Sequence, residues 1–488
     1  MIPAITLLFP ILIPIVGGVL ILFLHFKKDC HREVFSETVV LLTSAAVWLC
    51  ILFCRSHPIT IYSFTSGFSI TFSMDGLGCL FAGMISLMWP LVMLYAFSYM
   101  KESARKNSFF AFYVMTYGAA NGIAFAADMI TMYVFYEMLT LVTIPLVCHY
   151  QNHESMYAGR KYAAYTIGGA ALAFFAVVLT TLQSGGGTFL YGGDLRPGFD
   201  PSIMRIAFVF GFFGFGAKAA LFPLYSWLPT ASVAPTPVTA LLHAVAVVNA
   251  GVFAVMRMTW YVFGTELMRG SREQYFCLMV AVFSLLFGAV MALRERHFKR
   301  RLAFSTMSNL SYMLLGVMLM TPDGFAGGMA HMLFHGVIKM SLFLCAGAFM
   351  HKTGCNYIYE INGVGKKMPV TFGCYTLGAL SLTGIPLFCG FISKWKLLEA
   401  GAGEGSVFGL IGDAALIASA FLCAMYTLTI AVRAFFTASE KDHYANAVRD
   451  EADRMMLLPI LVFTAINVAF GIWPQGIMSL IGRIAGGG

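Results

Sequence analysis

The sequence has 488 residues, of which 59% are hydrophobic and only 11% are charged. Soluble domains carry about 25% charged residues, so the composition excludes a water-exposed globular protein. The formal net charge is +8, but the basic residues alternate by loop and form no patch, so we expect no nucleic-acid partner. The chain is therefore predicted to be an integral membrane protein.

Apolar stretches close to the ~20 residues that cross a bilayer repeat from end to end of the chain. They lie near 3–25, 36–54, 77–99, 109–126, 127–150, 162–183, 204–222, 236–262, 274–294, 301–320, 326–350, 370–397, 408–437 and 455–478. The first lacks a basic start and an A-x-A-type cleavage site, so we interpret it as a retained helix. The pattern predicts an all-α polytopic membrane protein of about fourteen transmembrane helices.

Two features orient these helices in the membrane. Residues 59–73, ITIYSFTSGFSITFS, alternate apolar and polar side chains around a Thr-Ser-Gly turn, which is typical of a small β-hairpin and places one on the outer face. If the N-terminus faces outward, 20 of the 31 Lys and Arg fall in inside segments. The positive-inside rule therefore places both termini outside, and the polar connection 438–455 is predicted to be an inside loop.

Helix-breaking residues interrupt two of the spans: Pro223, Pro229, Pro235, Pro237, Gly384 and Pro386. Proline removes a backbone donor, and non-helical backbone at membrane depth is tolerated only where protein covers it or where it lines a wet cavity. Each break stands next to a lysine, Lys218 or Lys394. Corresponding breaks in two halves favour inverted repeats and an ion path, with a purely structural kink as the alternative.

Two charged residues lie near the middle of apolar spans, Glu137 in MYVFYEMLTLVTIPL and Lys218 in FGFFGFGAKAALFP. Charge inside a membrane costs at least a few kcal/mol per residue. If the two side chains are apart, each prefers its neutral form, which is the basis of a switchable proton donor. If they are paired, they form a static ion pair that holds two helices together. On sequence alone the two interpretations are equally good.

The segment HMLFHGVIKMSLFL places His331, His335 and Lys339 at i, i+4 and i+8, on one face of a helix. Histidine titrates near neutral pH, so we interpret this stripe as a proton relay. A polar stripe satisfied by neighbouring helices is the structural alternative. A metal site is the least favoured interpretation, because the segment has no nearby Asp, Glu or Cys to complete a ligand shell.

Three further residues extend this pattern. His243, in TALLHAVAVVNAG, follows the first break, although a lone histidine there is also typical of packing. Lys299, in RERHFKRRLAFSTMS, would serve equally as an anchor at the lipid headgroups. Lys394 follows the second break much as Lys218 precedes the first. Together these side chains predict a chain of titratable groups from Glu137 to Lys394 near mid-membrane.

No cofactor is expected in this chain. Its 11 cysteines form no C-x-x-C pair and most lie inside apolar spans, which is typical of helix packing and not of a metal or iron–sulfur site. The sequence also has no nucleotide-binding glycine motif. We therefore predict neither a catalytic redox site nor a metal site here.

Four segments occur in a distinctive order: Lys218 to His243, KRRLAFSTMSNLSYMLLG, HMLFHGVIK and GIPLFCGFISKW. They resemble the antiporter-like M and N subunits of respiratory complex I (NADH-quinone oxidoreductase). The same family includes the D-type subunit of multisubunit (Mrp-type) sodium/proton antiporters and membrane subunits of energy-converting hydrogenases. The resemblance covers about residues 70–437.

The resemblance implies two inverted five-helix repeats, each with one broken helix, over 109–262 and 274–437. Residues 1–108 would form three N-terminal helices with the outer hairpin, and 438–488 an inside loop and the last helix. The family's relay carries over to Glu137, Lys218, His243, Lys299, His331, His335, Lys339 and Lys394. Many relatives have a lysine at Asn249, so here the central link would run through His243 and water. Because the sequence ends soon after the fourteenth predicted span, we also expect no long lateral helix and a closer likeness to the shorter M/N-type or D-type subunits.

The implied function is translocation of H⁺, with Na⁺ as a further candidate, by one subunit of a larger complex in a prokaryotic cell membrane. The implied partners are lipids, other hydrophobic subunits and, in a redox pump, iron–sulfur or hydrogenase subunits in a peripheral arm. The chain would then be the pumping subunit of an oxidoreductase or part of a secondary antiporter. Two alternatives are a stand-alone carrier of a small solute and a structural or quinone-contacting subunit of a redox enzyme.

Overall fold

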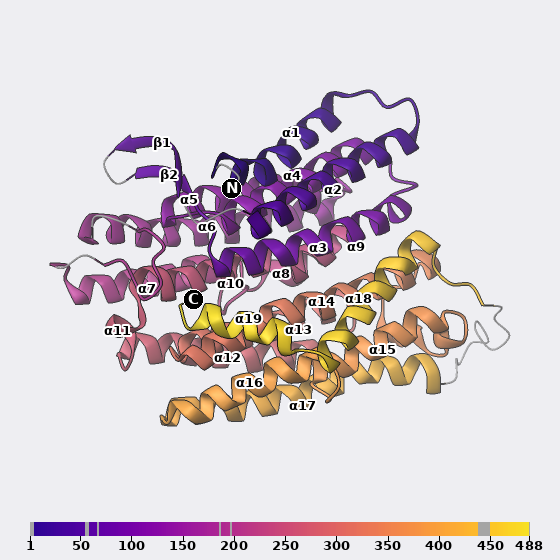
Figure 1. The fold of residues 1–488 in the computed structure, drawn as a ribbon. Helices are drawn as coiled ribbons and strands as arrows, with labels where there is room; N and C mark the ends of the chain where they lie inside the picture. Colours follow the sequence, from indigo (N-terminus) through magenta and orange to yellow (C-terminus); the bar gives the residue numbers. More distant parts are fainter. Residues whose placement is uncertain are drawn as a thin grey trace.

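The computed structural model of the protein describes residues 4–53, 58–65, 68–184, 187–195, 198–437 and 449–487. These residues are almost entirely helical, and most of the long helices run side by side through one bundle (Figure 1). Ten helical stretches among the described residues are long and apolar enough to cross a membrane. The chain is therefore an all-α polytopic membrane protein, as its composition predicts.

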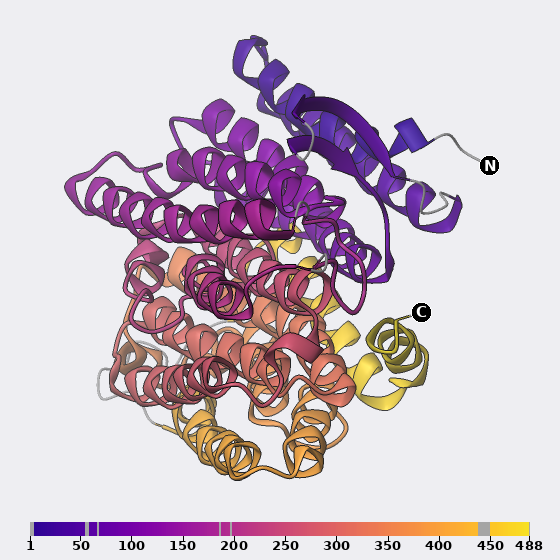
Figure 2. The same ribbon diagram turned by 90° about the vertical axis from the view of Figure 1, so that its left-hand side faces the viewer.

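The N-terminal helices occupy one side of the bundle, drawn from indigo to magenta in Figure 2. They are η1 (Ala4–Leu8), α1 (Phe9–Phe23), α2 (Asp29–Phe53), α3 (Gly76–Tyr99), α4 (Lys106–Ala124), α5 (Met129–Val147) and α6 (His153–Ser184). Between α2 and α3, strands β1 (Ile59–Thr65) and β2 (Phe68–Phe72) pair antiparallel. The predicted hairpin is thus confirmed, although residues 66–67 of its turn lie outside the described residues.

The middle of the chain is divided into short helical pieces. They are α7 (Pro201–Gly216), α8 (Trp227–Thr230), η2 (Ala231–Val233), α9 (Thr236–Ala244), α10 (Val247–Arg257), the π-helix η3 (Met258–Phe263) and α11 (Thr265–Met268). Pro235 precedes α9 and Pro237 lies in its first turn. Proline is accommodated there because the first amides of a helix have no partner within it. The α9–α10 and η3 stretch is fully enclosed by other elements.

The second half of the chain contains the longest helices. They are α12 (Arg272–Arg294), α13 (Phe298–Met318), α14 (Pro322–Thr353), η4 (Ile358–Ile361), η5 (Val364–Lys366), α15 (Pro369–Thr383), α16 (Cys389–Glu404), α17 (Val407–Phe436), α18 (Arg454–Ile472) and α19 (Gln475–Ala485). Every residue of α14 from Gly324 to Phe349 is buried. A helix enclosed on all sides belongs at the centre of a bundle, so α14 forms the middle of the second half.

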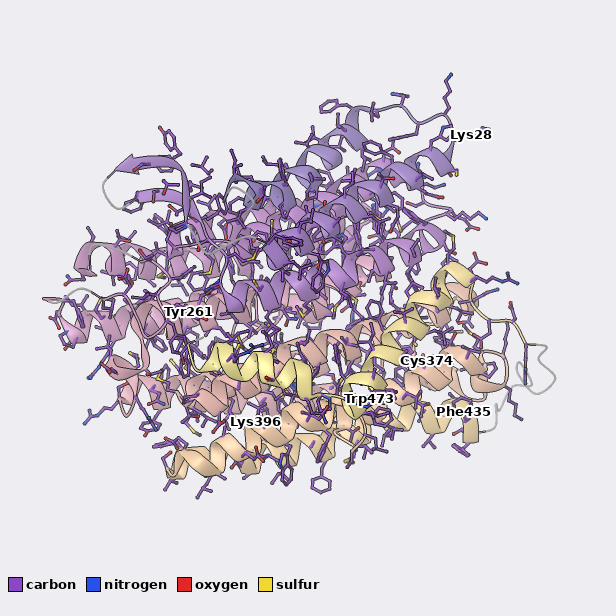
Figure 3. The ribbon with its side chains drawn as sticks, viewed as in Figure 1. Lys28, Tyr261, Cys374, Lys396, Phe435 and Trp473 are labelled. Carbon is purple, nitrogen blue, oxygen red and sulfur yellow. The ribbon has the colours of Figure 1, made fainter. Side chains whose placement is uncertain are left out.

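Four of the predicted spans are not single long apolar helices. They coincide with α4, α7, α13 and the α15–α16 pair, which are shorter, interrupted or more polar than the other spans. The last predicted span, 455–478, ends early, because the chain bends at Trp473 and Pro474 between α18 and α19 (Figure 3). Pro474 gives the physical reason, since proline cannot continue the hydrogen-bond ladder of α18.

The two ends of the bundle differ in the chain segments that they carry. Both chain ends lie toward the hairpin, whereas the α1–α2 connection and the end of α17 lie at the opposite end (Figure 1). Figure 3 shows Lys28 and Phe435 at that opposite end and Tyr261 toward the hairpin. The basic residues Arg55, Arg196 and Lys441, and most of the predicted inside loop 438–455, lie outside the described residues.

A partly buried ion pair joins α3 to α10 at the hairpin end of the bundle. Asp75 caps α3 by accepting from the Gly78 amide at 2.9 Å, and its Oδ1 also accepts from Nη2 of Arg257 at 2.6 Å. Nη1 of Arg257 bonds to the second oxygen of Asp75. The guanidinium lies 4.8–5.1 Å from the rings of three aromatic residues, Phe189, Phe253 and Tyr261.

Candidate functional site

Glu137 and Lys218 are close but do not form a contact ion pair. Glu137 lies at the middle of α5, and Lys218 follows the end of α7 in a non-helical turn. The Lys218 Nζ donates to the carbonyl of Tyr136 and lies 3.3 Å from the centre of its ring. Oε1 of Glu137 is buried and has no hydrogen-bond partner among the described residues. The static ion pair is therefore absent, and the two side chains remain within electrostatic range of each other.

His243 and Asn249 lie on either side of a second interruption, between α9 and α10. His243 is fully buried, its ring lies 4.9 Å from that of Phe343, and Nε2 is 3.5 Å from the Ser232 hydroxyl. Asn249 donates to the carbonyl of Ala244 at 2.7 Å. Because the interruption leaves that carbonyl without a helical partner, the Asn249 amide stabilises the break. At position 249, where we expect a lysine in many relatives, this chain therefore has the uncharged hydrogen-bond donor of an asparagine.

Lys299 borders a polar cavity of about 320 Å³ at the end of the bundle opposite the hairpin. Its Nζ donates to the Ala234 carbonyl at 2.9 Å, next to α9, and the side chain is 5% exposed. Glu154, Ser232 and His297 are among the other residues that line this cavity. Burial, together with the charges of Lys299 and Arg300, lowers the pKa of His297 to about 4. His297 is therefore neutral at physiological pH.

The predicted stripe on α14 lies among polar side chains of α13 and α16. The rings of His331 and His335 are 5.9 Å apart. His331 bonds through Nδ1 to Ser393 at 2.9 Å and through Nε2 to Asn309 at 3.2 Å. Neither ring nitrogen of His335 has a hydrogen-bond partner among the described residues. The stripe thus contacts α13 on one side and α16 on the other.

Lys339 continues this network toward α13 and α17. Its Nζ donates to the Leu302 carbonyl at 3.0 Å and to the Ser305 hydroxyl at 2.7 Å. The Tyr426 hydroxyl donates to the same Ser305 oxygen at 3.0 Å. Sequence reasoning missed Ser305, Asn309, Ser393 and Tyr426. The sequence gives a local signal for Ser305 and Asn309 alone. With Tyr312 they are spaced at i, i+4 and i+7, which places them on one face of α13.

Lys394 lies in α16, just beyond the non-helical residues 384–388. Its Nζ donates to the carbonyls of Leu382 and Thr383, at 2.6 and 3.2 Å, which end α15. Lys394 also borders a mainly apolar cavity of about 450 Å³ between α16 and α17. The lysine therefore satisfies the carbonyls that the second break exposes, as Lys299 does beside the first.

A substitution at Gly384 tests the backbone conformation at the second break. It ends α15 with φ +97°, and an added Cβ would lie 3.1 Å from Cδ of Lys394. Because L residues rarely adopt this φ, Gly384→Ala should destabilise the protein by about 1–2 kcal/mol. Gly373→Ala, in open space within α15, is the matched control and should be neutral or slightly stabilising. Thermal unfolding of both variants in detergent measures the difference, and equal midpoints would contradict the assigned backbone strain.

The four lysines share one property that matters for chemistry. Lys218, Lys299, Lys339 and Lys394 are each at most 7% exposed, and within the described ranges none lies within 4.0 Å of a carboxylate. Their partners are carbonyls and hydroxyls, which hydrogen-bond to an amine in either protonation state. A buried amine held in this way can gain or lose a proton without breaking an ion pair.

The described residues contain no group of three or more His, Cys, Asp and Glu side chains that could hold a metal ion. His331 and His335 instead bond to hydroxyl and amide groups or have no described partner. His335 lies within electrostatic range of Lys339, His331, Lys394 and His243. The arrangement is therefore suited to proton transfer among nitrogen bases.

Comparison with known proteins assigns the chain to a family. Residues 126–417, more than half of the chain, match the family described as NADH:quinone oxidoreductase/Mrp antiporter, TM. The chain belongs to this family. The matched range contains every residue of the network from Glu137 to Lys394, so the resemblance inferred from the sequence is confirmed.

Two curated relatives represent the two branches named in the family description. The chain is 30% identical over 441 residues to the A-type subunit of the Na⁺/H⁺ antiporter of Alkalihalophilus pseudofirmus, covering 84% of this chain and 53% of the relative. It is 29% identical over 468 residues to the N-type subunit of the NADH-quinone oxidoreductase of Desulforudis audaxviator, covering 91% of each. The chain thus spans about half the length of the A-type antiporter relatives and nearly all of the N-type relative.

Two solved structures share the fold at low sequence identity. One is the archaeal membrane-bound sulfane sulfur reductase, with a TM-score of 0.84 and 21% identity, covering 99% of this chain and 97% of that chain. The other is the Mrp complex from Dietzia sp., with a TM-score of 0.84, 20% identity and the same coverage. They show that chains of this fold occur in an archaeal respiratory membrane complex and in an Mrp complex.

Proposed function

We propose that this chain translocates protons across the membrane as one subunit of a multisubunit complex. The observation that carries the proposal is the set of four buried lysines and three buried histidines, in which no lysine has a described carboxylate partner. Buried ionisable groups are costly in a membrane and mark ion pathways. Family membership supports the same function, because the named relatives are subunits of antiporters and quinone reductases.

The path that we propose runs from Glu137 and Lys218 through His243 to Lys339, His335 and His331, and ends at Lys394. His243 lies within electrostatic range of Lys339 and Lys299. Water would bridge the interval between Lys218 and His243, because Asn249 contributes no titratable group there. The polar cavity beside Lys299 would admit protons from the end of the bundle opposite the hairpin.

Nitrogen bases favour the proton over Na⁺ as the transported ion. Sodium, like other hard cations, is bound by oxygen ligands, whereas seven of the eight titratable side chains in this network are amines or imidazoles. These groups bind a proton and have no affinity for Na⁺ when they are protonated. Sodium movement, where it occurs in the complex, would then use other residues or another subunit.

We also propose fourteen membrane passes with two inverted five-helix repeats over 109–262 and 274–437, in a prokaryotic cell membrane with both termini outside. The interrupted stretches α7–α10 and α15–α16 support corresponding halves, since each has a lysine at its break. The partners would be other hydrophobic subunits, with iron–sulfur or hydrogenase subunits if the complex is a redox pump. Gentle purification through this chain distinguishes these cases, because only a redox pump would bring metal-bearing subunits.

Glu137→Gln is the experiment that tests proton translocation. Because it removes the charge and keeps the shape, we expect an assembled complex whose proton pumping into vesicles falls by about a hundredfold or more. Glu266→Gln, in the exposed turn α11, is the matched control and should pump normally. Undiminished pumping by Glu137→Gln would leave the chain with a structural role only.

A further inference from the structure

Arg301, in the first turns of α13, is a buried cation that the proposed path does not use. Its side chain is 5% exposed. Nε donates to the Glu295 carbonyl at 2.9 Å, Nη1 to the Tyr426 carbonyl at 3.1 Å and Nη2 to the Leu293 carbonyl at 3.0 Å. Each guanidinium nitrogen therefore has a carbonyl partner, from α12, α17 or the connection before α13.

No carboxylate pairs with this charge within the described parts of the chain. The ion pairs found there do not include Arg301. Glu295 is the nearest acid in sequence, and its Oε1 accepts from the amides of Arg296 and His297, at 2.8 and 2.9 Å. Arg433 of α17 lies within electrostatic range and adds a second positive charge, and Glu295 lies within electrostatic range as well and offsets part of this charge. Because a guanidinium does not lose its proton in proteins, this positive field is permanent.

The position of Arg301 relates it directly to the proton network. Ser305, which holds Lys339, lies four residues further along α13, a rise of about 6 Å. Tyr426 contacts both residues, because its hydroxyl donates to Ser305 and its carbonyl accepts from Arg301. Arg301 therefore stands between the Lys339 network and the end of the bundle that lies opposite the hairpin.

Lys299 and Arg301, both in the first turn of α13, have their partners in different halves of the protein. Lys299 precedes Arg301 by two residues, so the two side chains point to nearly opposite faces of α13. Lys299 borders the polar cavity beside the first break, and its Nζ bonds to Ala234. Arg301 instead fills the corresponding level of the second half, between α12 and α17. A polar cavity therefore lies beside Lys299 in the first half, and the carbonyl-bonded guanidinium of Arg301 lies at the corresponding level of the second half.

We propose that Arg301 is an electrostatic seal that keeps protons from leaking between the Lys339 network and the bundle end opposite the hairpin. An arginine beside a pore excludes protons and cations in this way in other channels. At an effective dielectric constant of about 20, a unit charge one helical turn away lowers the population of a second cation on the order of a hundredfold. This inference rests on the proposed function, because a seal matters only where protons would otherwise pass.

The test is passive proton leakage, measured without any driving reaction. The intact complex, purified through this chain, is reconstituted into liposomes that contain a pH-sensitive dye, and valinomycin with a potassium gradient imposes the voltage. Arg301→Gln keeps two donors for the carbonyls and removes the charge, so we expect leakage at least about tenfold above wild type. Arg301→Lys keeps the charge, so its proton leakage should stay at the wild-type level. Arg300→Gln, a partly exposed neighbour, is the control and should also leak at the wild-type level.

These variants distinguish an electrostatic barrier to protons from a residue that only hydrogen-bonds to backbone carbonyls. If Arg301→Lys leaks as much as Arg301→Gln, the carbonyl bonds matter and not the charge, and the proposal is wrong. A fully assembled Arg301→Gln complex that leaks no more protons than wild type overturns the proposal as well. Loss of pumping without leakage in Glu137→Gln reports separately on the translocation path, so the failure of one proposal is distinguishable from the failure of the other.

A second measurement leaves Arg301 unchanged, in case its variants do not assemble. Ser232→Cys lies on the wall of the polar cavity, and Ser305→Cys lies behind Arg301. A cationic methanethiosulfonate reagent applied from the end opposite the hairpin should label Ser232→Cys at least about tenfold faster than Ser305→Cys, relative to the unmodified chain. Equal labelling rates at the two positions would show that no barrier exists and would overturn the proposal.

Discussion

The Lys218→Met complex should assemble with wild-type stability and pump protons about a hundredfold or more slowly than the unchanged protein. Methionine has a similar length and no charge, so the helices around it need not move. Lys218 has no carboxylate partner among the described residues, and its Nζ bonds to the backbone carbonyl of Tyr136 and lies over its ring. Removing a buried charge without an ion-pair partner does not strand an opposite charge in the membrane.

Proton uptake by reconstituted vesicles measures the loss, and thermal unfolding of the purified complex measures the stability. Lys366→Met, at an exposed position in η5, is the matched control and should leave both quantities unchanged. Normal pumping by the Lys218→Met complex would remove this lysine from the path. A large loss of stability would mean that Lys218 and Glu137 do form an ion pair in the membrane.

Asp75→Ala should cause the largest loss of stability among simple substitutions at the hairpin end of the bundle. It leaves the guanidinium of Arg257, which is 1% exposed, without its carboxylate, and it removes the cap of α3. Breaking a buried pair by removing one partner typically costs about 3–5 kcal/mol, and losing the cap costs about 1 kcal/mol more. Because Asp75 is 32% exposed, we expect a total of about 3 kcal/mol.

The double variant Asp75→Asn with Arg257→Met tests the cause of this loss. Asparagine retains the cap, and methionine removes the charge that would otherwise be unpaired. We therefore expect the double variant to unfold at a higher temperature than Asp75→Ala. If the double variant is the less stable of the two, the pair stabilises the fold by its mutual attraction and not by neutralising a buried charge.

Local sequence patterns predicted the features that depend on nearest neighbours along the chain. The alternation in 59–73 predicted the hairpin, and the i, i+4 spacing predicted that His331 and His335 share a face of α14. Apolar stretches located the helices, because each must cover its own length of bilayer. The bend at Pro474 was missed, although proline gives a signal there, because apolar residues precede it and resume at Ile477.

Contacts between distant segments could not be predicted in the same way. The contact of Lys218 with Tyr136, instead of with Glu137 next to it, depends on how α7 ends against α5. The bonds of His331 to Asn309 and Ser393 join three helices that are far apart in sequence. A single sequence contains the donors and acceptors of such a network, but their pairing is decided only when the helices pack.

Apart from Lys299, the titratable side chains lie near the middles of their helices or at the breaks, as Glu137 in α5, His335 in α14 and Lys394 in α16 show. Along the proposed path, transfer between them would therefore run parallel to the membrane plane and would cross little of the transmembrane voltage. A charge that moves across the full voltage changes in energy by about 2.3 kcal/mol per 100 mV. In this protein almost all of that work would fall on the steps by which a proton enters and leaves, so the voltage dependence of turnover would report on access and not on the internal transfers.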